Sequence, residues 1–318
     1  MTTLTRAETA RWLSERDQFL ILTHVRPDGD CLGAGFALYS VAKKLNKSAD
    51  FLCDSPFPEH YSFIKNHEIF GKRELSEYDL AISVDCADEF RMGEYSDIYF
   101  SCKQTVNIDH HATNTMFAAV NEVCADASST CEIVYLLLKD SGLIDAGIAQ
   151  DLYMGISTDT GHFRHSNTKP NTLLAAAQLL EFDFDAVKLV DNLYRNNTVE
   201  KMRLIGLALN KMHYYCDEKV AVIALSQRDL KECGCVMADT EGIIDYPMSV
   251  GSVVVAVCMT QQSSLSFKVS FRSKGPNVAK IAGKFGGGGH VLAAGCVVNG
   301  DFNSCVAKVV KAVSEDML

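Results

Sequence analysis

The segment TVNIDHH, from Thr105 to His111, joins a short apolar run to three consecutive side chains of types that bind metal ions. The apolar run and the turn-like residues 112–114 after it predict a buried strand that ends at Asp109-His110-His111. Because an unpaired charge in a low-dielectric place is costly, an acid and two histidines there need a partner. A mutually satisfied Asp–His pair is the structural interpretation, and a metal site is the functional one.

Three other apolar segments of the chain also run into acidic side chains. They are residues 19–30, which contain His24, Asp28 and Asp30, residues 80–85, which end on Asp85, and residues 151–159, which end on Asp159. Each alone is compatible with a helix cap or an Asx turn. The carboxyl ends of parallel strands, however, converge on one edge of an open α/β sheet, where such folds place their sites. We therefore interpret all four segments as strand ends that share one site.

Metal-assisted hydrolysis is the chemistry that needs such a cluster. Carboxylates and imidazoles without thiolates suit Mn²⁺ or Mg²⁺ better than a structural Zn²⁺ site. Two ions ~3.5–4 Å apart can hold the attacking and leaving oxygens of a phosphoryl displacement and lower the pKa of a bridging water. One carboxylate must then bridge the ions, and Asp85, a lone acid at the end of a predicted central strand, fits that role.

In their order along the chain, these motifs resemble those of the DHH phosphoesterase superfamily. The residues that carry the resemblance are His24-x-x-Pro27-Asp28-x-Asp30-x-x-Gly33-Ala34, Asp85, Asp109-His110-His111 and Asp159-Thr160-Gly161. Residues 286–295, GGGGHVLAAG, are similar to the GGGH-x-x-A-A-G signature of the DHH-associated C-terminal domain. The resemblance extends from about residue 18 to residue 296, and no metal-binding position of the family pattern is missing.

The resemblance implies a set of ligands for two Mn²⁺ ions, with Mg²⁺ or Co²⁺ as substitutes. One ion is expected on His24, Asp28 and Asp85, and the other on Asp30, Asp85, His110 and Asp159. The expected catalytic residues are Asp85, which bridges the ions, His111, which stabilises charge on the scissile phosphate, and Asp109, which orients the histidines.

The resemblance also implies where the substrate binds. Glycines let backbone N–H groups approach a phosphate closely, so Gly287, Gly288 and Gly289 are expected to bind one, with His290 as a further donor. Arg272 ends an alternating segment, 265–272, and a guanidinium matches phosphate bidentately. A flexible glycine loop and a solvated arginine are the structural alternatives.

Arg164 is a further candidate contact for the substrate. It lies in residues 159–168, DTGHFRHSNT, which resemble the D-T-G-x-F-R-x-S-N-T segment of DHH phosphodiesterases that degrade very short RNA.

Alternating apolar and helical segments predict an α/β fold with a parallel sheet in the first part of the chain. Helices are expected over 33–45, 129–140, 145–155 and 171–180, and strands of a smaller α/β domain over 220–225, 252–258 and 265–272. We predict a catalytic DHH domain over 1–186, a helical linker over 187–216 with one helical stretch at 187–213, and a substrate-binding domain over 217–318. By resemblance, the active site lies in the cleft between the domains.

Composition limits the partners. The net charge is −10, from 40 acidic and 30 basic residues, whereas proteins that bind long duplex nucleic acid carry a basic face. The 12 cysteines form no C-x-x-C pair, which indicates reduced thiols of a cytosolic protein. No apolar run reaches the ~18 residues of a membrane helix, and the first residues are polar. We therefore expect a cytoplasmic protein without membrane attachment.

The function implied by the resemblance is a Mn²⁺-dependent phosphodiesterase and phosphatase that uses hydroxide activated by two metals. Its expected substrates are short 5′-phosphorylated oligoribonucleotides (nanoRNA, and dinucleotides such as pApA) and 3′-phosphoadenosine 5′-phosphate (pAp), which it would convert to mononucleotides and to AMP. A homodimer is compatible with the family. Two alternatives stay open: a phosphodiesterase selective for pApA from cyclic di-AMP turnover, and a non-catalytic nucleotide-binding regulator.

Overall fold

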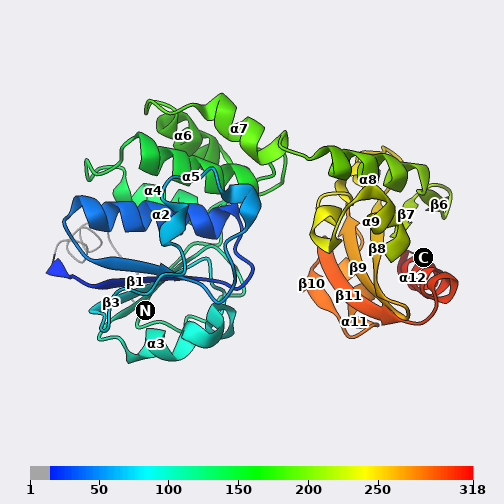
Figure 1. The fold of residues 1–318 in the computed structure, drawn as a ribbon, viewed down its shortest axis with the longest axis horizontal. Coiled ribbons are helices and arrows are strands. Elements are labelled where there is room, and N and C mark those ends of the chain that lie inside the picture. The colour runs from blue at the N-terminus through cyan, green and yellow to red at the C-terminus, as the bar shows by residue number, and fades with distance from the viewer. Residues whose placement is uncertain (1–14, 318) are drawn as a thin grey trace. The chain divides into compact units, whose positions relative to one another are not determined.

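The computed structural model describes residues 15–317. The chain forms two compact units, and the boundary along the sequence lies between Asn196 and Asn197. Each unit has its own β-sheet with helices packed on it (Figure 1). The predicted α/β fold, with a parallel sheet in the first unit, is confirmed. Within residues 15–317, no helix combines the length and the apolar character that crossing a bilayer requires.

The sheet of the first unit has five parallel strands in the order β2-β1-β3-β4-β5. The strands are β1 (Phe19–Thr23), β2 (Ala49–Leu52), β3 (Leu80–Val84), β4 (Thr105–Asp109) and β5 (Val120–Val123). The first four are buried along their whole length, because helices cover both faces of a parallel sheet. The strand order reverses between β1 and β3, and ligands of such sheets bind at the carboxyl ends of strands beside that reversal.

Helices of the first unit lie on both faces of this sheet. They are α2 (Gly29–Lys44), α3 (Ser96–Ser101), α4 (Thr130–Leu138), α5 (Ala146–Asp159), α6 (Pro170–Leu179) and α7 (Ala186–Tyr194), with the 3₁₀ turns η1 (Glu59–Tyr61), η2 (His67–Ile69) and η3 (Glu89–Tyr95). Figure 1 shows α2, α4 and α5 on one face and α3 on the other. Alternate residues of β1 enter the two cores: Phe19 and Ile21 pack with α2, whereas Leu20 and Leu22 pack with Tyr99 of α3.

A close contact between α2 and α5 depends on glycine. A Cβ atom on Gly33 would overlap the backbone carbonyl oxygen of Asp151 and the Sγ of Cys131. A Cβ on Gly155 would overlap the same sulfur atom and approach the carboxylate of Asp30. Gly33 therefore sets how closely α2 approaches α5, and Gly155 sets how closely α5 approaches Cys131 and Asp30.

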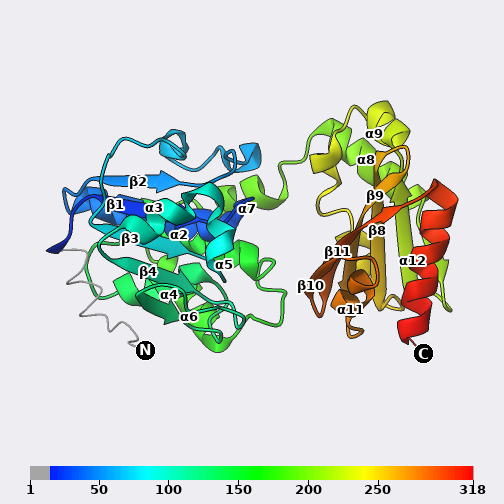
Figure 2. The same cartoon turned by 90° about the horizontal axis from the view of Figure 1, so that it is seen from below.

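The second unit has a six-stranded mixed sheet in the order β10-β11-β9-β8-β7-β6. The strands are β6 (His213–Tyr215), β7 (Val220–Leu225), β8 (Val255–Ser263), β9 (Ser266–Ser273), β10 (Gly288–His290) and β11 (Ala293–Asn299). The helices are α8 (Val199–Asn210), α9 (Gln227–Cys233), α10 (Asp245–Met248), α11 (Val278–Gly283) and α12 (Phe302–Met317), with the 3₁₀ turn η4 (Met237–Thr240). One face packs against α11 and α12, and the other against α8 and α9 (Figure 2).

Two predictions about local structure were wrong. The segment that ends at Asp159 is the C-terminal part of helix α5, not a strand, because the helix that Asp145 caps continues to Asp159 and buries Leu152 and Ile156 on its inner side. The predicted single helix over 187–213 is interrupted: α7 ends at Tyr194, Thr198 caps α8 through its side chain, and β6 begins at His213. The predicted domain limits at 186/187 and 216/217 stay predictions.

Gly33→Ala is expected to destabilise the first unit by about 1–3 kcal/mol, because the added methyl group meets the rigid backbone of α5. Gly147→Ala is the matched control, since a Cβ there meets only the Asp145 carboxylate at an ordinary 3.5 Å, and alanine is the better helix former. Urea denaturation followed by circular dichroism measures both. Equal midpoints for the two variants would contradict the proposed close packing.

Candidate metal centre

The predicted metal ligands of the first unit lie at the carboxyl edge of its sheet. His24 follows β1, Asp85 follows β3, and Asp109 ends β4 just before His110 and His111. Two helix ends complete the group, as Asp28 caps α2, Asp30 lies in its first turn, and Asp159 is the last residue of α5. The structure thus brings side chains from three strands and two helices to one place.

Asp85 lies between two histidines. Its Oδ2 is 3.4 Å from Nε2 of His24, and its Oδ1 is 3.5 Å from Nε2 of His110. On the first side, Nε2 of His24 is also 3.7 Å from Oδ2 of Asp28. On the second side, Nε2 of His110 is 3.7 Å from Oδ2 of Asp159 and 4.0 Å from Oδ2 of Asp30. Each oxygen of one carboxylate therefore faces a separate group of donors.

The backbone holds Asp85 in an unusual conformation. Its φ is +59°, in the left-handed region that residues other than glycine rarely adopt and that is often retained at functional sites. The Asp85 N–H donates to the carbonyl oxygen of Ile108 at 2.9 Å, and the Thr130 hydroxyl donates to Oδ1 at 3.1 Å. These bonds fix a carboxylate that is almost fully buried.

The N-terminus of α4 binds the carboxylate of Asp30. The backbone N–H of Thr130 donates to Oδ2 at 2.7 Å, and that of Cys131 donates to Oδ1 at 2.9 Å. Free N–H groups at a helix start favour a negative charge. Burial together with the charges of Asp85 and Asp159 nevertheless raises the pKa of Asp30 well above its usual value.

Burial and neighbouring charges also shift the pKa of Asp159. Burial raises its pKa to about 6, with the charge of Asp85 adding to that effect and His110 opposing it. For Asp28, burial is outweighed by the hydrogen bond and charge of His24 and by backbone N–H groups, which lower the pKa to about 2. Without a cation, Asp30 and Asp159 thus bind protons more readily than free carboxylates do. Divalent ions fit this set of oxygen and nitrogen donors, and their binding would release those protons.

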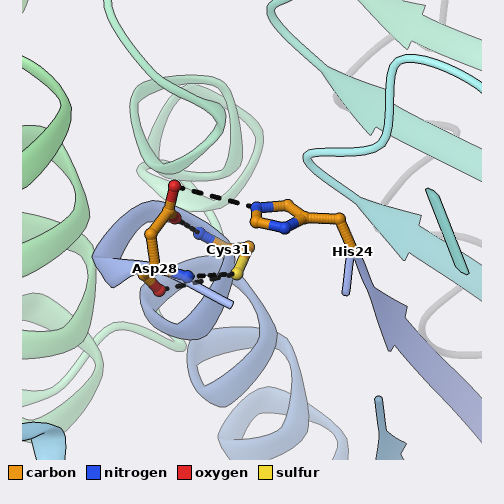
Figure 3. Close-up of side chains that lie close together, drawn as sticks. All are labelled: His24, Asp28 and Cys31. Atoms are coloured by element: carbon orange, nitrogen blue, oxygen red, sulfur yellow. Dashed lines mark hydrogen bonds and ion pairs between the residues drawn. The ribbon is translucent and has the colours of Figure 1, made fainter. Parts of the chain in front are cut away.

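Within residues 15–317, two groups of donor atoms are compact enough to hold an ion. In each of them the potential ligand atoms lie within 4.8 Å of one another: His24, Asp28 and Cys31 form one group, shown in Figure 3, and Asp85, His110 and His111 form the other. The first group contains a thiol, Cys31, which the sequence analysis did not count among the ligands. The second contains His111, for which the sequence analysis expected a contact with the phosphate instead.

Asp109 is fully buried and binds His111. Its Oδ1 lies 2.7 Å from Nδ1 of His111, and its Oδ2 accepts a 2.6 Å hydrogen bond from the side-chain amide of Asn114. The hydrogen bond to Asp109 raises the pKa of His111. The geometry is that of a carboxylate that orients an imidazole, and Asp109 contacts one of the two histidines.

Several residues that support the site were not singled out from the sequence. Thr130 and Asn114 have been described, and the side-chain amide of Asn167 donates to Oδ2 of Asp159 at 3.2 Å and to the Ser128 carbonyl at 2.9 Å. Asn167 lies in the SNT part of residues 159–168, so its segment was recognised in the sequence, but the role of the Asn167 side chain was not predicted. Thr130 and Asn114 lie outside the motifs and gave no signal.

The predicted substrate-binding residues lie in both units. In the first unit, Arg164 is exposed, and its Nε donates to the Gly161 carbonyl at 2.6 Å, close in sequence to Asp159. In the second unit, His290 on β10 pairs with Ala293 on β11, which pairs in turn with Arg272 on β9. Directly opposed residues share a face of a sheet, so the side chains of His290 and Arg272 lie on the same face.

Two of the glycines before His290, Gly287 and Gly289, are required by close approaches of the backbone. Gly289 has a φ of +143°, and a Cβ on it would approach the Ala293 carbonyl oxygen. A Cβ on Gly287 would overlap the Gly295 carbonyl oxygen, whereas Gly288 has no neighbour within 4 Å. Residues 288–290 form an exposed edge strand.

Asp109→Asn is expected to lower the pKa of His111 in the metal-free protein, because it removes the carboxylate that raises it. The stability that the Asp109–His111 pair contributes is fully present below the unfolded-state pKa of about 6.5 and is lost as the pH rises through the higher folded-state value. NMR titration of the His111 ring protons measures the shift. Asp126→Asn, at an exposed acid paired with Lys169, is the control; an unchanged His111 pKa in Asp109→Asn would refute the assignment.

Comparisons with known proteins show which family and fold the chain shares. Residues 18–156 match the model of the DHH family, N-terminal domain, and residues 216–317 match that of the DHHA1 domain. The chain is 32% identical over 302 residues to the bifunctional oligoribonuclease and PAP phosphatase NrnA of Thermus thermophilus, with 93% of this chain and 89% of that protein covered. It is 26% identical over 298 residues to the NrnA of Bacillus subtilis, with 92% and 93% covered. A solved structure of an exopolyphosphatase-related protein from Bacteroides fragilis has a TM-score of 0.91 at 25% identity, with 98% of this chain and 95% of that chain covered.

Proposed function

We propose that this chain, which belongs to the DHH family and is a phosphoesterase, hydrolyses short 5′-phosphorylated oligoribonucleotides to mononucleotides and pAp to AMP with two Mn²⁺ ions. The observation that carries the proposal is the position of Asp85, whose two oxygens face His24 on one side and His110 on the other at 3.4 and 3.5 Å. Such a carboxylate is suited to bridge two cations.

The proposed ligands are those of the sequence analysis. His24, Asp28 and Asp85 would hold one ion, and Asp30, Asp85, His110 and Asp159 would hold the other. Ions there supply Lewis-acid activation of water and neutralise charge on the phosphate. Burial and the neighbouring carboxylates raise the pKa of Asp30 and of Asp159, which supports a site that binds cations.

His111 is suited to donate a proton or a hydrogen bond to the phosphate. Its side chain is more exposed than that of His110, at 27% against 15%. With Nδ1 hydrogen-bonded to Asp109, the raised pKa favours the imidazolium form, in which Nε2 is also a donor. Asp109 thus acts as a positioning residue that keeps a cationic donor in place.

The substrate class follows from the relatives and from charge. Two relatives that the chain matches over about nine-tenths of its length are named oligoribonuclease and PAP phosphatase. A net charge of −10 favours short ligands over long duplex nucleic acid. Arg272, His290 and the glycines before it are the proposed contacts for the phosphate or sugar of a nucleotide, and Arg164 is a further proposed substrate contact. A cytoplasmic location and a homodimer stay predictions.

Product analysis tests the proposal directly. Purified protein with Mn²⁺ is incubated with pApA, a 5′-phosphorylated RNA pentamer and pAp, each with an EDTA control. We expect mononucleotides from the first two and AMP from pAp, all suppressed by EDTA. Cleavage of pApA alone would indicate a phosphodiesterase of cyclic di-AMP turnover. If the protein binds all three substrates but forms no product from any of them, a non-catalytic regulator would be favoured.

Asp85→Asn is expected to reduce turnover by a factor on the order of 10³ or more, because it removes the charge that both ions share. Metal content, measured by mass spectrometry of the protein after dialysis, should fall as well. Asp126→Asn, on the surface, is the control that should keep wild-type rates. A near-wild-type rate for Asp85→Asn would rule out the bridging assignment.

His290→Ala is expected to raise KM for pApA several-fold with little change in kcat, because the residue is proposed to act on binding alone. Initial-rate kinetics on pApA and on bis(4-nitrophenyl) phosphate separate the two effects. The second substrate has no nucleotide for His290 to bind, so its KM should stay the same. A loss of kcat on both substrates would place His290 in the chemical step instead.

A further inference from the structure

Cys31 belongs to one of the two compact donor groups of the metal centre. It lies in the first turn of α2 and is fully buried, and its Sγ lies within 4.8 Å of a ring nitrogen of His24 and a carboxylate oxygen of Asp28 (Figure 3). Those two residues are proposed ligands of the first ion. The sulfur atom therefore lies among the donors that would surround that ion.

The orientation of His24 leaves one nitrogen atom for the ion. Its Nδ1 lies 3.0 Å from the Val25 carbonyl oxygen, which can only accept, so Nδ1 carries the proton in that bond. Nε2 is then the donor atom in neutral His24, and it faces oxygen atoms of Asp85 and Asp28 at 3.4 and 3.7 Å. The imidazole nitrogen thus faces two carboxylate oxygens, and the sulfur atom lies within 4.8 Å of a ring nitrogen of His24 and of an oxygen of Asp28.

The distances suit one ion. Nitrogen and sulfur ligands of a zinc-like ion lie about 2.0 and 2.3 Å from it, so donors on opposite sides are at most roughly 4.4 Å apart. Donor atoms within 4.8 Å of one another reach a common ion with sub-ångström adjustments. The backbone N–H of Asp28 donates to Sγ at 3.2 Å, so the sulfur atom already lies in hydrogen-bonding contact with the residue that supplies a carboxylate to this group.

Several buried thiols near the centre donate to a backbone carbonyl, including Cys31, whose Sγ donates to that of Asp28 at 3.5 Å. Sγ of Cys53 donates to the His24 carbonyl at 3.2 Å, that of Cys131 to the Asp30 carbonyl at 3.3 Å, and that of Cys86 to the Val84 carbonyl at 3.5 Å. Across residues 15–317, the two compact donor groups include no thiol besides Cys31. Proximity to the site is shared by several cysteines, whereas a position among the ligand atoms belongs to Cys31.

We propose that Cys31 is a sulfur ligand of the ion at His24 and Asp28, and that it makes this position selective for thiophilic divalent cations such as Zn²⁺, Co²⁺ and Cd²⁺ over Mg²⁺. The inference rests on the proposed function, in which an ion binds there. On binding, the thiol proton leaves to solvent, a metal–sulfur bond forms and the ion stays divalent. Soft thiolate donors select such ions over Mg²⁺, which prefers oxygen ligands.

Cobalt spectroscopy tests the sulfur bond directly. Metal-free wild-type protein, Cys31→Ser and the control Cys53→Ser are titrated with Co²⁺ alone. We expect a near-ultraviolet sulfur-to-cobalt charge-transfer band in the wild type and in Cys53→Ser, and its loss in Cys31→Ser. Serine keeps an acceptor for the Asp28 N–H, so helix capping is preserved, and matching thermal melts of the metal-free proteins verify this.

A competition measurement gives an independent readout. The ratio of Cd²⁺ to Mn²⁺ affinity, from calorimetry, should fall at least tenfold in Cys31→Ser and stay unchanged in Cys53→Ser. Visible cobalt bands without a charge-transfer band in the wild type, or a band that survives in Cys31→Ser, would overturn the role of Cys31 alone. Failure of the wild type to bind Co²⁺ at all would overturn both this inference and the proposed metal-dependent function.

Discussion

Mutual repulsion among carboxylates at the edge of the first sheet is the constraint that the rest of the site must offset. Asp30 and Asp85 are buried, and Asp159 is partly buried. Burial and the charges of neighbouring carboxylates raise the pKa of Asp30 and of Asp159. Hydrogen bonds from the N-terminus of α4 to Asp30 and from Thr130 to Asp85 offset part of that cost. The remainder must be neutralised by protons or cations, so the folded edge favours the binding of positive charge.

The fold meets this constraint through close packing of helices. Gly33 lets the first turn of α2, which carries Asp30, approach the backbone of α5, and Gly155 leaves room for Cys131 beside the same carboxylate. Asp159 reaches the cluster only because α5 continues to that residue. Meanwhile β1 and β3 deliver His24 and Asp85 beside the point at which the strand order reverses. The chemistry of the edge thus depends on glycines in the helical layer as much as on the ligands themselves.

Sequence patterns predicted the parts of this arrangement that depend on local order. The apolar runs before His24, Asp85 and Asp109 are β1, β3 and β4, because buried parallel strands need continuous apolar residues. The run before Asp159 was misassigned because a short apolar segment fits a helix or a strand equally well. Thr130 and Asn114 were missed for another reason: they act on Asp85 and Asp109 by hydrogen bonds between side chains that only the folded chain brings together. No residue type or spacing in the sequence predicts such contacts.

Cys31 shows how the same limit affects the chemistry. In the sequence it is one of 12 cysteines and follows Asp30 without any thiol motif, so oxygen and nitrogen donors alone suggested Mn²⁺ or Mg²⁺. In the structure the first turn of α2 directs its sulfur atom back to Asp28 and His24. The two sides of Asp85 therefore differ: nitrogen, oxygen and sulfur donors surround one, whereas nitrogen and oxygen donors surround the other. A single bridging carboxylate would then join a softer position to a harder one, and two different cations could occupy them at the same time.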